Sequence, residues 1–271
     1  MKCIYINLER ATTRRAQLEA NWAEYGGRDW ELERFPAVDA RYIEDTNVPG
    51  TLRPGEKGCF FSHSAVIEMN RGATAPIFVM EDDMVLGKST ADTVNKFLNV
   101  CNSYDWDIAY TDVCIPLPQT MLDLVKLRHE LSDSGEVRLL DVKDFPFAGA
   151  TAYIVNHRSL DKLAGLLAQE EELNYPYDLV LRRLIYERKL KGLVFFPFVT
   201  SLSDESDVSQ IQQDVSADVI WNGFRKIVWI DRDLKKVLPS IEQIDRELCD
   251  DESRLLGVLF AGMLSKSYTE K

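Results

Sequence analysis

The chain has 271 residues, a length that suits one α/β domain with a sizeable core. Lys and Arg total 32, and Asp and Glu total 44, so the formal net charge is −12 at pH 7. This acidity argues against a protein whose main partner is nucleic acid. Hydrophobic residues make up 45% of the chain, which excludes a wholly disordered protein.

The sequence contains no clear targeting or membrane-spanning segment. Asn7 and Glu9 interrupt the apolar residues near the N-terminus, so a secretory signal is not expected there. The longest apolar run, residues 255–264, is shorter than the ~20 residues of a membrane span and suits a core helix or an interfacial segment. The five cysteines form no CxxC pair and are expected to be reduced. These features predict a cytoplasmic protein.

The N-terminal segment predicts a strand, a helix and a second strand. Residues 3–8 are mostly apolar without alternation, as in a strand buried on both faces. The helix that follows is expected to be capped by Thr12 or Thr13 and to end at Gly26-Gly27. Residues 35–38 predict the second strand.

The middle of the chain continues this alternation. Residues 41–57 are rich in Pro, Gly and charge and predict a loop, and residues 59–71 predict a helix. Residues 76–80 predict a third strand, residues 94–101 a helix and residues 106–110 another strand.

The following segment is less regular. Residues 115–147 contain three prolines and are expected to leave the sheet as an irregular excursion that could shape an acceptor site. Residues 150–155 predict a strand, and the leucines of residues 160–167 predict a helix. A further helix is expected from Pro176 to Gly192, followed by a strand over residues 193–199.

The repeated β-α-β order predicts an α/β fold with a mostly parallel central sheet and helices on both faces. Residues 200–216 are polar and predict a loop. We expect residues 1–214 to form the main domain and residues 215–271 to form a helical C-terminal extension packed on it.

The strongest chemical signal is the carboxylate run Glu81-Asp82-Asp83, which directly follows an apolar strand. Ligands of open α/β sheets gather at the carboxyl ends of the strands. Adjacent carboxylates repel one another unless a cation lies among them, and their oxygens suit Mg²⁺ or Mn²⁺. A solvated acidic turn or a helix N-cap is the alternative interpretation.

Two other positions carry weaker signals. Cys59 and His63 would share one face of a helix, and His63 is either a core histidine or a donor to a phosphate or sugar. Asp178 follows Pro176 at an expected helix start, where it is either an N-cap or a general base facing a cleft.

An ordered set of short motifs resembles glycosyltransferase family 25, the bacterial lipooligosaccharide β-galactosyltransferases to which the collagen galactosyltransferases are related. The matching pieces are Ile6-Asn7-Leu8 with Arg14, residues 56–63 (EKGCFFSH), 77–83 (IFVMEDD), 106–108 (WDI), 149–155 (GATAYIV), 176–178 (PYD), Pro197 and 206–208 (SDV). The resemblance implies a GT-A fold, a nucleotide-sugar donor, usually UDP-galactose, Mn²⁺ or Mg²⁺ as cofactor, and inversion at the anomeric carbon.

The resemblance also implies roles for individual residues. Asp83, with Glu81, would bind the metal, and Asp178 would be the catalytic base. The donor would contact Asn7, Leu8, Arg14, Gly58, Ser62, His63, Glu81 and Asp82. The implied acceptor is a glycan or lipid-linked glycan of the lipopolysaccharide type.

Three questions stay open on the sequence alone. A nucleotidyltransferase would also gather carboxylates around Mg²⁺, but its glycine-rich early loop is missing from residues 9–15. A third interpretation is a transferase-like domain that has lost its activity and serves only in binding or adhesion. The acidic C-terminal residues favour a core or homodimer contact over peripheral contact with the inner membrane face.

Overall fold

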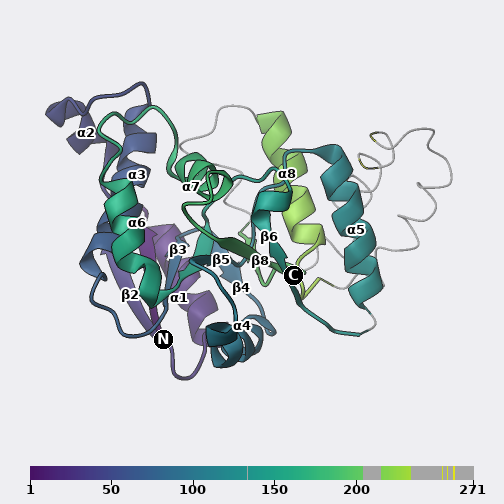
Figure 1. The fold of residues 1–271 in the computed structure, drawn as a ribbon. Coiled ribbons are helices and arrows are strands. Elements are labelled where there is room, and N and C mark those ends of the chain that lie inside the picture. The colour runs from purple at the N-terminus through teal and green to yellow at the C-terminus, as the bar shows by residue number, and fades with distance from the viewer. Residues whose placement is uncertain (133, 204–214, 233–251, 253–254, 256–258, 260–271) are drawn as a thin grey trace.

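The computed structural model describes residues 1–132, 134–203, 215–232, 252, 255 and 259. Figure 1 shows a central twisted sheet flanked by helices, with the N-terminus beside α1 and β2. The strands in spatial order are β2 (Glu31–Pro36), β1 (Lys2–Asn7), β3 (Ile77–Glu81), β7 (Ala152–Val155), β5 (Ile108–Tyr110), β8 (Gly192–Phe196) and β6 (Arg138–Asp141).

The sheet is mostly parallel. Strand β1 runs parallel to β2 and β3, and β5 runs parallel to β8. Strand β7 is antiparallel to both β3 and β5, so β3 and β5 share one direction, and β6 is antiparallel to β8. Only β6 and β7 therefore oppose the common direction of this sheet, which confirms the expected α/β fold.

Alternating side chains on the strands bury opposite faces of the sheet. Ile4 and Ile6 of β1 pack with α3 (Pro54–Met69), α6 (Leu160–Leu167) and α7 (Tyr177–Tyr186). Cys3 and Tyr5 pack with α1 (Thr12–Tyr25) and α4 (Thr90–Val100). The two-residue period of a strand explains why a run that is apolar throughout serves both layers.

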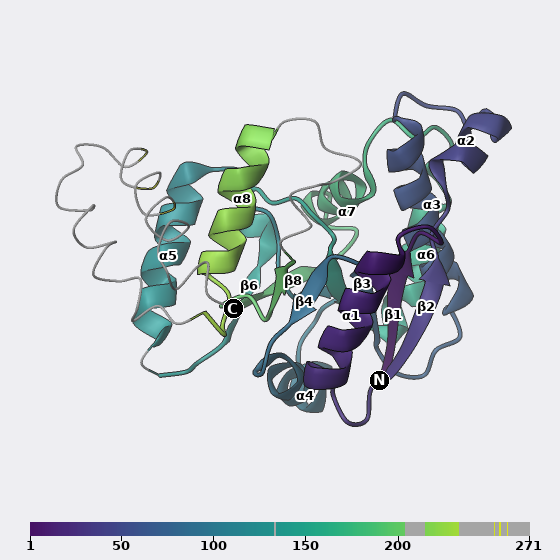
Figure 2. The same ribbon diagram turned by 180° about the vertical axis from the view of Figure 1, so that it is seen from behind.

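The smaller elements complete the molecule. Strands β4 (Met84–Leu86) and β9 (Thr200–Leu202) form a second, antiparallel sheet. Helices α5 (Pro118–Ser132) and α8 (Val215–Ile227) lie side by side in the two opposite views of Figures 1 and 2. The short elements are α2 (Ala40–Thr46), η1 (Cys101–Ser103), η2 (Val142–Asp144) and η3 (His157–Ser159).

The prediction of a loop over residues 41–57 is wrong. Helix α2 occupies its first part, where Asp39 caps the helix by accepting a hydrogen bond from the Arg41 backbone N–H. Helix α3 begins at Pro54, five residues before the predicted start, and Arg53 and Glu56 form its capping box. The proline and charges that suggested a loop are therefore helix-start signals.

The prediction of an irregular segment over residues 115–147 is also wrong. Pro118 is the first residue of α5, a position where proline removes no needed hydrogen-bond donor. Strand β6 follows and pairs with β8 at the edge of the sheet.

Several boundaries differ by a few residues from those predicted. Strand β2 occupies residues 31–36 because it pairs with β1 from Lys2 opposite Glu31 onward. Helix α7 ends at Tyr186, and β9 lies inside the predicted loop 200–216. Ala11, rather than Thr12 or Thr13, is the N-cap of α1, and no side chain caps it.

Helix α8 is packed on the core of the main sheet through the buried residues Phe224 and Ile227, and the buried Val228 directly follows the helix. Most of the predicted C-terminal extension, residues 233–251, 253–254, 256–258 and 260–271, lies outside the described residues. Cys3, Cys59, Cys101 and Cys114 form no disulfide. Among the helices of the described residues, none combines the length and apolar character needed to cross a membrane.

Candidate active site

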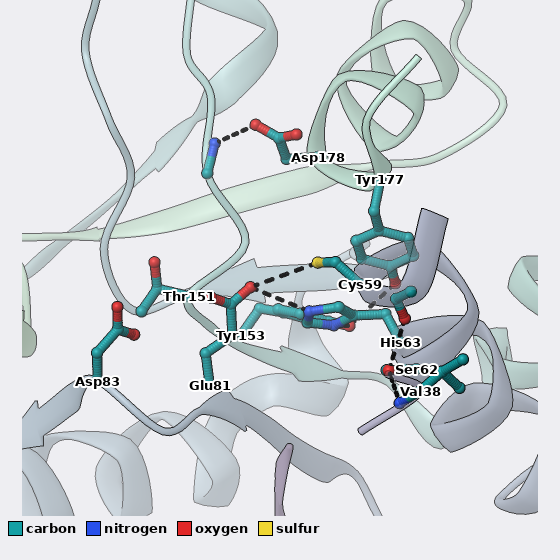
Figure 3. A network of polar contacts seen from close by, with 12 residues as sticks. Val38, Cys59, Ser62, His63, Glu81, Asp83, Thr151, Tyr153, Tyr177 and Asp178 are labelled. Carbon is teal, nitrogen blue, oxygen red and sulfur yellow. Dashed lines mark hydrogen bonds and ion pairs between the residues drawn. The ribbon is translucent and has the colours of Figure 1, made fainter. Parts of the chain in front are cut away.

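A cavity of about 350 Å³ opens at the carboxyl end of β3. Its wall is built by residues from α3, the end of β3, the segment before β7, the start of α7 and α8, including Cys59, Glu81, Asp83, Gly149, Thr151, Tyr177, Asp178, Trp221 and Arg225. Figure 3 shows the side chains of Glu81, Cys59 and His63 close together, with Asp83 and Asp178 beside them. Three sequence-predicted residues, Glu81, Asp83 and Asp178, thus line one cavity.

The acidic run is held by two residues from the N-terminal segment. Asn7 Nδ2 donates to Asp82 Oδ2 at 2.7 Å. Arg14 forms ion pairs with Asp82 Oδ1 at 3.2 Å and with Asp83 Oδ2 at 2.8 Å. The structure therefore brings together Asn7, Arg14, Asp82 and Asp83, although Asn7, Arg14 and Asp82 are not part of the cavity wall.

The two carboxylate oxygens of Asp83 differ in their contacts, since Oδ2 pairs with Arg14. The Asp83 Oδ1 is buried and has no hydrogen-bond partner among the described residues. Burial raises the pKa of Asp83 to about 7, and the nearby Glu81 carboxylate adds to the rise while Arg14 opposes it. Two carboxylates that repel one another and an unpartnered oxygen are the electrostatic conditions that a cation would relieve.

His63 holds Glu81 from inside the protein. The ring is 1% exposed and stacks on Tyr177 at a centroid distance of 4.5 Å. Its Nε2 lies 3.1 Å from Glu81 Oε1, and its Nδ1 lies 2.9 Å from the Tyr153 hydroxyl. His63 is therefore a core histidine by position, and it reaches the cavity through Glu81 rather than directly.

Gly58 and Ser62, for which the resemblance implies donor contacts, make contacts inside the protein. Ser62 is buried, donates to the Gly58 carbonyl at 2.6 Å and accepts from the Val38 backbone N–H at 2.8 Å. A Cβ at Gly58 would lie 2.4 Å from the Val38 carbonyl oxygen. Both residues thus face the segment after β2, and neither lines the cavity.

Leu8 is half-buried, and its backbone carbonyl accepts from the Ala11 N–H at 2.9 Å at the start of α1. Its side chain does not belong to the cavity wall. The motif piece at residues 206–208 lies outside the described residues.

Asp178 is fixed by the backbone of a neighbouring loop. Its Oδ2 accepts a hydrogen bond of 2.7 Å from the Gly149 N–H. Gly149 has φ +87°, a conformation that side-chain-bearing residues rarely adopt, so glycine is needed to present this N–H. Burial raises the pKa of Asp178, partly offset by backbone hydrogen bonds from Gly149 and Leu179. The N-cap of α7 is Pro176, so the capping role considered for Asp178 is not observed.

Sequence reasoning missed a cationic residue of the cavity, Arg225 on α8. Its guanidinium forms a buried ion pair with Asp112, with Nε 2.8 Å from Asp112 Oδ2, and it donates to Thr151 Oγ1 at 2.9 Å. Asp112 is fully buried, so this pair ties α8 to the segment after β5. No local motif marks Arg225, because its partner lies 113 residues earlier in the chain.

An α/β fold with carboxylates gathered at a strand end is an arrangement found in metal-dependent transferases, and a family comparison narrows the class. The sequence profile of glycosyltransferase family 25, described as an LPS biosynthesis protein family, matches residues 1–181. The chain belongs to this glycosyltransferase family. No curated protein matches the sequence.

The similarity to solved glycosyltransferase structures is low, with all three TM-scores below 0.4. Apo GlyE of Streptococcus pneumoniae TIGR4 has a TM-score of 0.37 and 8% identity over 70% of this chain and 44% of that chain. The galactosyltransferase LgtC, solved with donor and acceptor sugar analogues, has a TM-score of 0.34 and 10% identity over 72% and 73%. Mouse xyloside xylosyltransferase 1 has a TM-score of 0.33 and 12% identity over 70% and 63%. The chain thus spans less than half of the first of these proteins.

Proposed function

We propose that this chain is an inverting, metal-dependent transferase that moves galactose from UDP-galactose to a hydroxyl of a lipopolysaccharide-type glycan, in β linkage. The observation that carries the proposal is the pairing, in one cavity, of two differently placed carboxylates. Asp83 has a buried oxygen that no described residue partners, whereas Asp178 has its position fixed by a backbone N–H. Family membership supports the reaction class.

The residues at the end of β3 fit a divalent cation. Asp83 Oδ1 would be the first ligand, and the carboxylate of Glu81 faces the same cavity. Oxygen ligands of this kind suit Mn²⁺ or Mg²⁺, which would neutralise the charge that grows on a departing diphosphate. Asn7 and Arg14 keep Asp82 and Asp83 in place, and we assign this side of the cavity to the nucleotide end of the donor.

Asp178 is the proposed general base. In the displacement, the acceptor oxygen bonds to the anomeric carbon, the bond from that carbon to the diphosphate oxygen breaks, and the acceptor proton passes to Asp178. A base must keep its lone pairs for the proton, so it cannot also be tied to a metal. The rise in the pKa of Asp178 makes it a stronger base than an exposed aspartate, and the Gly149 N–H occupies only Oδ2.

The remaining assignments extend this proposal to the cellular setting. We assign the enzyme to the cytoplasm, with its lipid-linked acceptor presented at the inner membrane face. From the sequence we assign a core or homodimer contact to the apolar C-terminal segment, because the acidic residues beside it would be repelled by an anionic membrane surface; most of this segment lies outside the described residues.

The test is a screen of nucleotide sugars by ligand-induced thermal stabilisation, with and without Mn²⁺, followed by a transfer assay. UDP-galactose is expected to raise the melting temperature more than UDP-glucose, UDP-N-acetylgalactosamine or UDP-xylose, and only when Mn²⁺ is present. Stabilisation that is equal with and without Mn²⁺ would contradict the metal assignment. A larger rise in melting temperature with another UDP-sugar would assign that sugar, instead of galactose, as the one transferred.

A further inference from the structure

Three potential metal ligands of different chemistry meet on the wall of the cavity. Cys59 and His63 lie one helical turn apart on α3, and Glu81 ends β3. The Cys59 Sγ, a His63 ring nitrogen and a Glu81 carboxylate oxygen all lie within 4.8 Å of one another. Figure 3 shows the sulfur and the imidazole directed at the same carboxylate.

The two distances from the Glu81 oxygen to the other ligand atoms are close to those of a tetrahedral zinc site. With Zn–S near 2.3 Å and Zn–N and Zn–O near 2.1 Å, tetrahedral angles place nitrogen and oxygen about 3.4 Å apart and sulfur and oxygen about 3.6 Å apart. The corresponding distances are 3.1 Å from His63 Nε2 to Glu81 Oε1 and 3.9 Å from Cys59 Sγ to Glu81 Oε1. Both agree to within about 0.3 Å, so small side-chain shifts would admit the ion.

The surroundings of His63 also suit coordination. Its Nδ1 is already engaged by the Tyr153 hydroxyl at 2.9 Å, which leaves Nε2 to face Glu81. A hydrogen bond on the second ring nitrogen is the usual support of a metal-binding histidine. His63 itself is buried, whereas Cys59 and Glu81 line the cavity, so a fourth coordination position would open toward the cavity.

We propose that Cys59, His63 and Glu81 form a binding site for a thiophilic divalent cation, Zn²⁺ in particular, with its fourth position open to the cavity. The thiolate and imidazole select Zn²⁺ over Mg²⁺ and Mn²⁺, which prefer oxygen ligands. Coordination releases the Cys59 thiol proton to solvent. This site differs from the proposed oxygen-ligand site of Asp83 in its Cys59 and His63 ligands and shares Glu81 with it, and Zn²⁺ binding does not depend on transferase activity.

The test uses the full chain after treatment with a chelator, titrated with Co²⁺ as a spectroscopic substitute for Zn²⁺. One equivalent is expected to give intense visible bands of four-coordinate Co²⁺ and a near-ultraviolet thiolate-to-metal band, and Zn²⁺ is expected to displace it. Cys59→Ser removes the thiolate band and weakens Zn²⁺ binding at least about 10-fold. Tyr153→Phe weakens Zn²⁺ binding about 10- to 100-fold while keeping the thiolate band.

The matched control is Cys114→Ser, because Cys114 lines the same cavity but is not one of the three ligands. It is expected to leave the Co²⁺ spectrum and the Zn²⁺ affinity unchanged. Circular dichroism checks folding, and Cys59→Ala replaces Cys59→Ser if the serine variant is misfolded. A thiolate band that survives both Cys59 variants, or that disappears in Cys114→Ser, overturns the proposal, as does weak octahedral Co²⁺ absorption alone. Failure of the proposed function would appear separately, as absent Mn²⁺-dependent transfer in the wild type.

Discussion

Asp83 and Asp178 share a cavity, but their hydrogen bonds suit them to different tasks. Asp178 accepts a backbone hydrogen bond, which orients it without neutralising it, whereas one buried oxygen of Asp83 has no partner in the part of the chain that the structure describes. Pairs of carboxyl groups in unlike environments are a common arrangement for dividing catalytic roles. The division proposed here, base for Asp178 and metal ligand for Asp83, leads to separate predictions at the two positions.

Asp178→Asn is expected to reduce transfer at least about 100-fold, because an amide cannot accept the acceptor proton while it can still accept the Gly149 hydrogen bond. The same variant is expected to be more stable than the wild type at pH 8. The pKa of Asp178 is raised in the folded state, so the native protein holds the proton to higher pH than the unfolded chain. Wild-type stability therefore falls as pH rises above the ordinary aspartate pKa.

Thermal unfolding of both proteins between pH 4 and pH 8 measures this linkage. The gain in melting temperature of Asp178→Asn is expected to be largest at pH 8 and to shrink as the pH falls toward 4. A gain that is the same across this range would mean that ionisation of Asp178 is not its cause. Retention of more than about a tenth of the transfer activity would remove Asp178 as the base.

Asp83→Ala is expected to abolish transfer while the protein stays folded, because the variant loses the unpartnered oxygen assigned to the metal. Asp82→Ala is the matched comparison. Asp82 already accepts from Asn7 and pairs with Arg14, so its loss is expected to reduce transfer less. Transfer rates measured over a range of Mn²⁺ concentrations distinguish the two. An equal loss at both positions would leave the choice of Asp83 as ligand without support.

At the scale of elements, Gly58 sets how closely α3 approaches the segment after β2. An added methyl at Gly58 would meet the Val38 carbonyl oxygen at 2.4 Å, and a backbone oxygen cannot move aside cheaply. Gly58→Ala is therefore expected to lower the free energy of unfolding by about 1–3 kcal/mol. Gly165→Ala on α6 is the control, since nothing lies within 4 Å of the added atom.

The control is expected to stabilise the protein by about 0.5–1 kcal/mol, because alanine favours a helix interior over glycine. Chemical denaturation of both variants measures whether each change lowers or raises the free energy of unfolding. If Gly58→Ala were as stable as the wild type, α3 would not be positioned by this contact.

The elements that the sequence predicts well are those whose apolar pattern is set by the sheet itself. Strand β3, with its acidic end at Glu81, is predicted within a residue because a buried strand leaves an unbroken apolar run. Helices α2 and α5 were missed because proline and charge at a helix start look like a loop when the following packing is unknown.

The residues of the candidate site also fall into two groups, those that a local sequence pattern predicts and those that depend on contacts between distant segments. The carboxylates of residues 81–83 stand out locally, because three of them follow one strand. The role of His63 as a support for Glu81 depends on the packing of α3 against β3 and β7, which no local pattern encodes. The Arg225 side chain was missed for the same reason, since its partners Asp112 and Thr151 come from distant segments.

For the whole molecule, the buried pair of Arg225 and Asp112 joins α8 to the main sheet. Arg225→Met is expected to destabilise the protein by about 3–5 kcal/mol, because Asp112 would be left as an uncompensated buried charge. The matched control is Arg138→Met, whose ion pair with Glu136 is about half exposed. That change is expected to alter the free energy of unfolding by less than about 1 kcal/mol.

Adding Asp112→Asn to Arg225→Met is expected to restore part of the lost stability, because the second change removes the buried charge. A double-mutant cycle compares the free energies of unfolding of the wild type, Arg225→Met, Asp112→Asn and the double variant, measured with denaturant. If Arg225→Met cost no more than Arg138→Met, the Arg225–Asp112 pair would not hold α8 in place, and the apolar contacts of Phe224 and Ile227 would have to account for its packing.

The separation of Asp112 and Arg225 along the chain also has a consequence for biosynthesis. A ribosome delivers the sheet strands, the acidic run and Asp178 well before it delivers Arg225. Until α8 emerges, Arg225 cannot pair with Asp112, and the cavity wall is incomplete. The nascent chain also exposes the apolar surface that Phe224 and Val228 later cover. The cavity wall can therefore be completed only after residue 225 has been synthesised, later than every carboxylate assigned to the site.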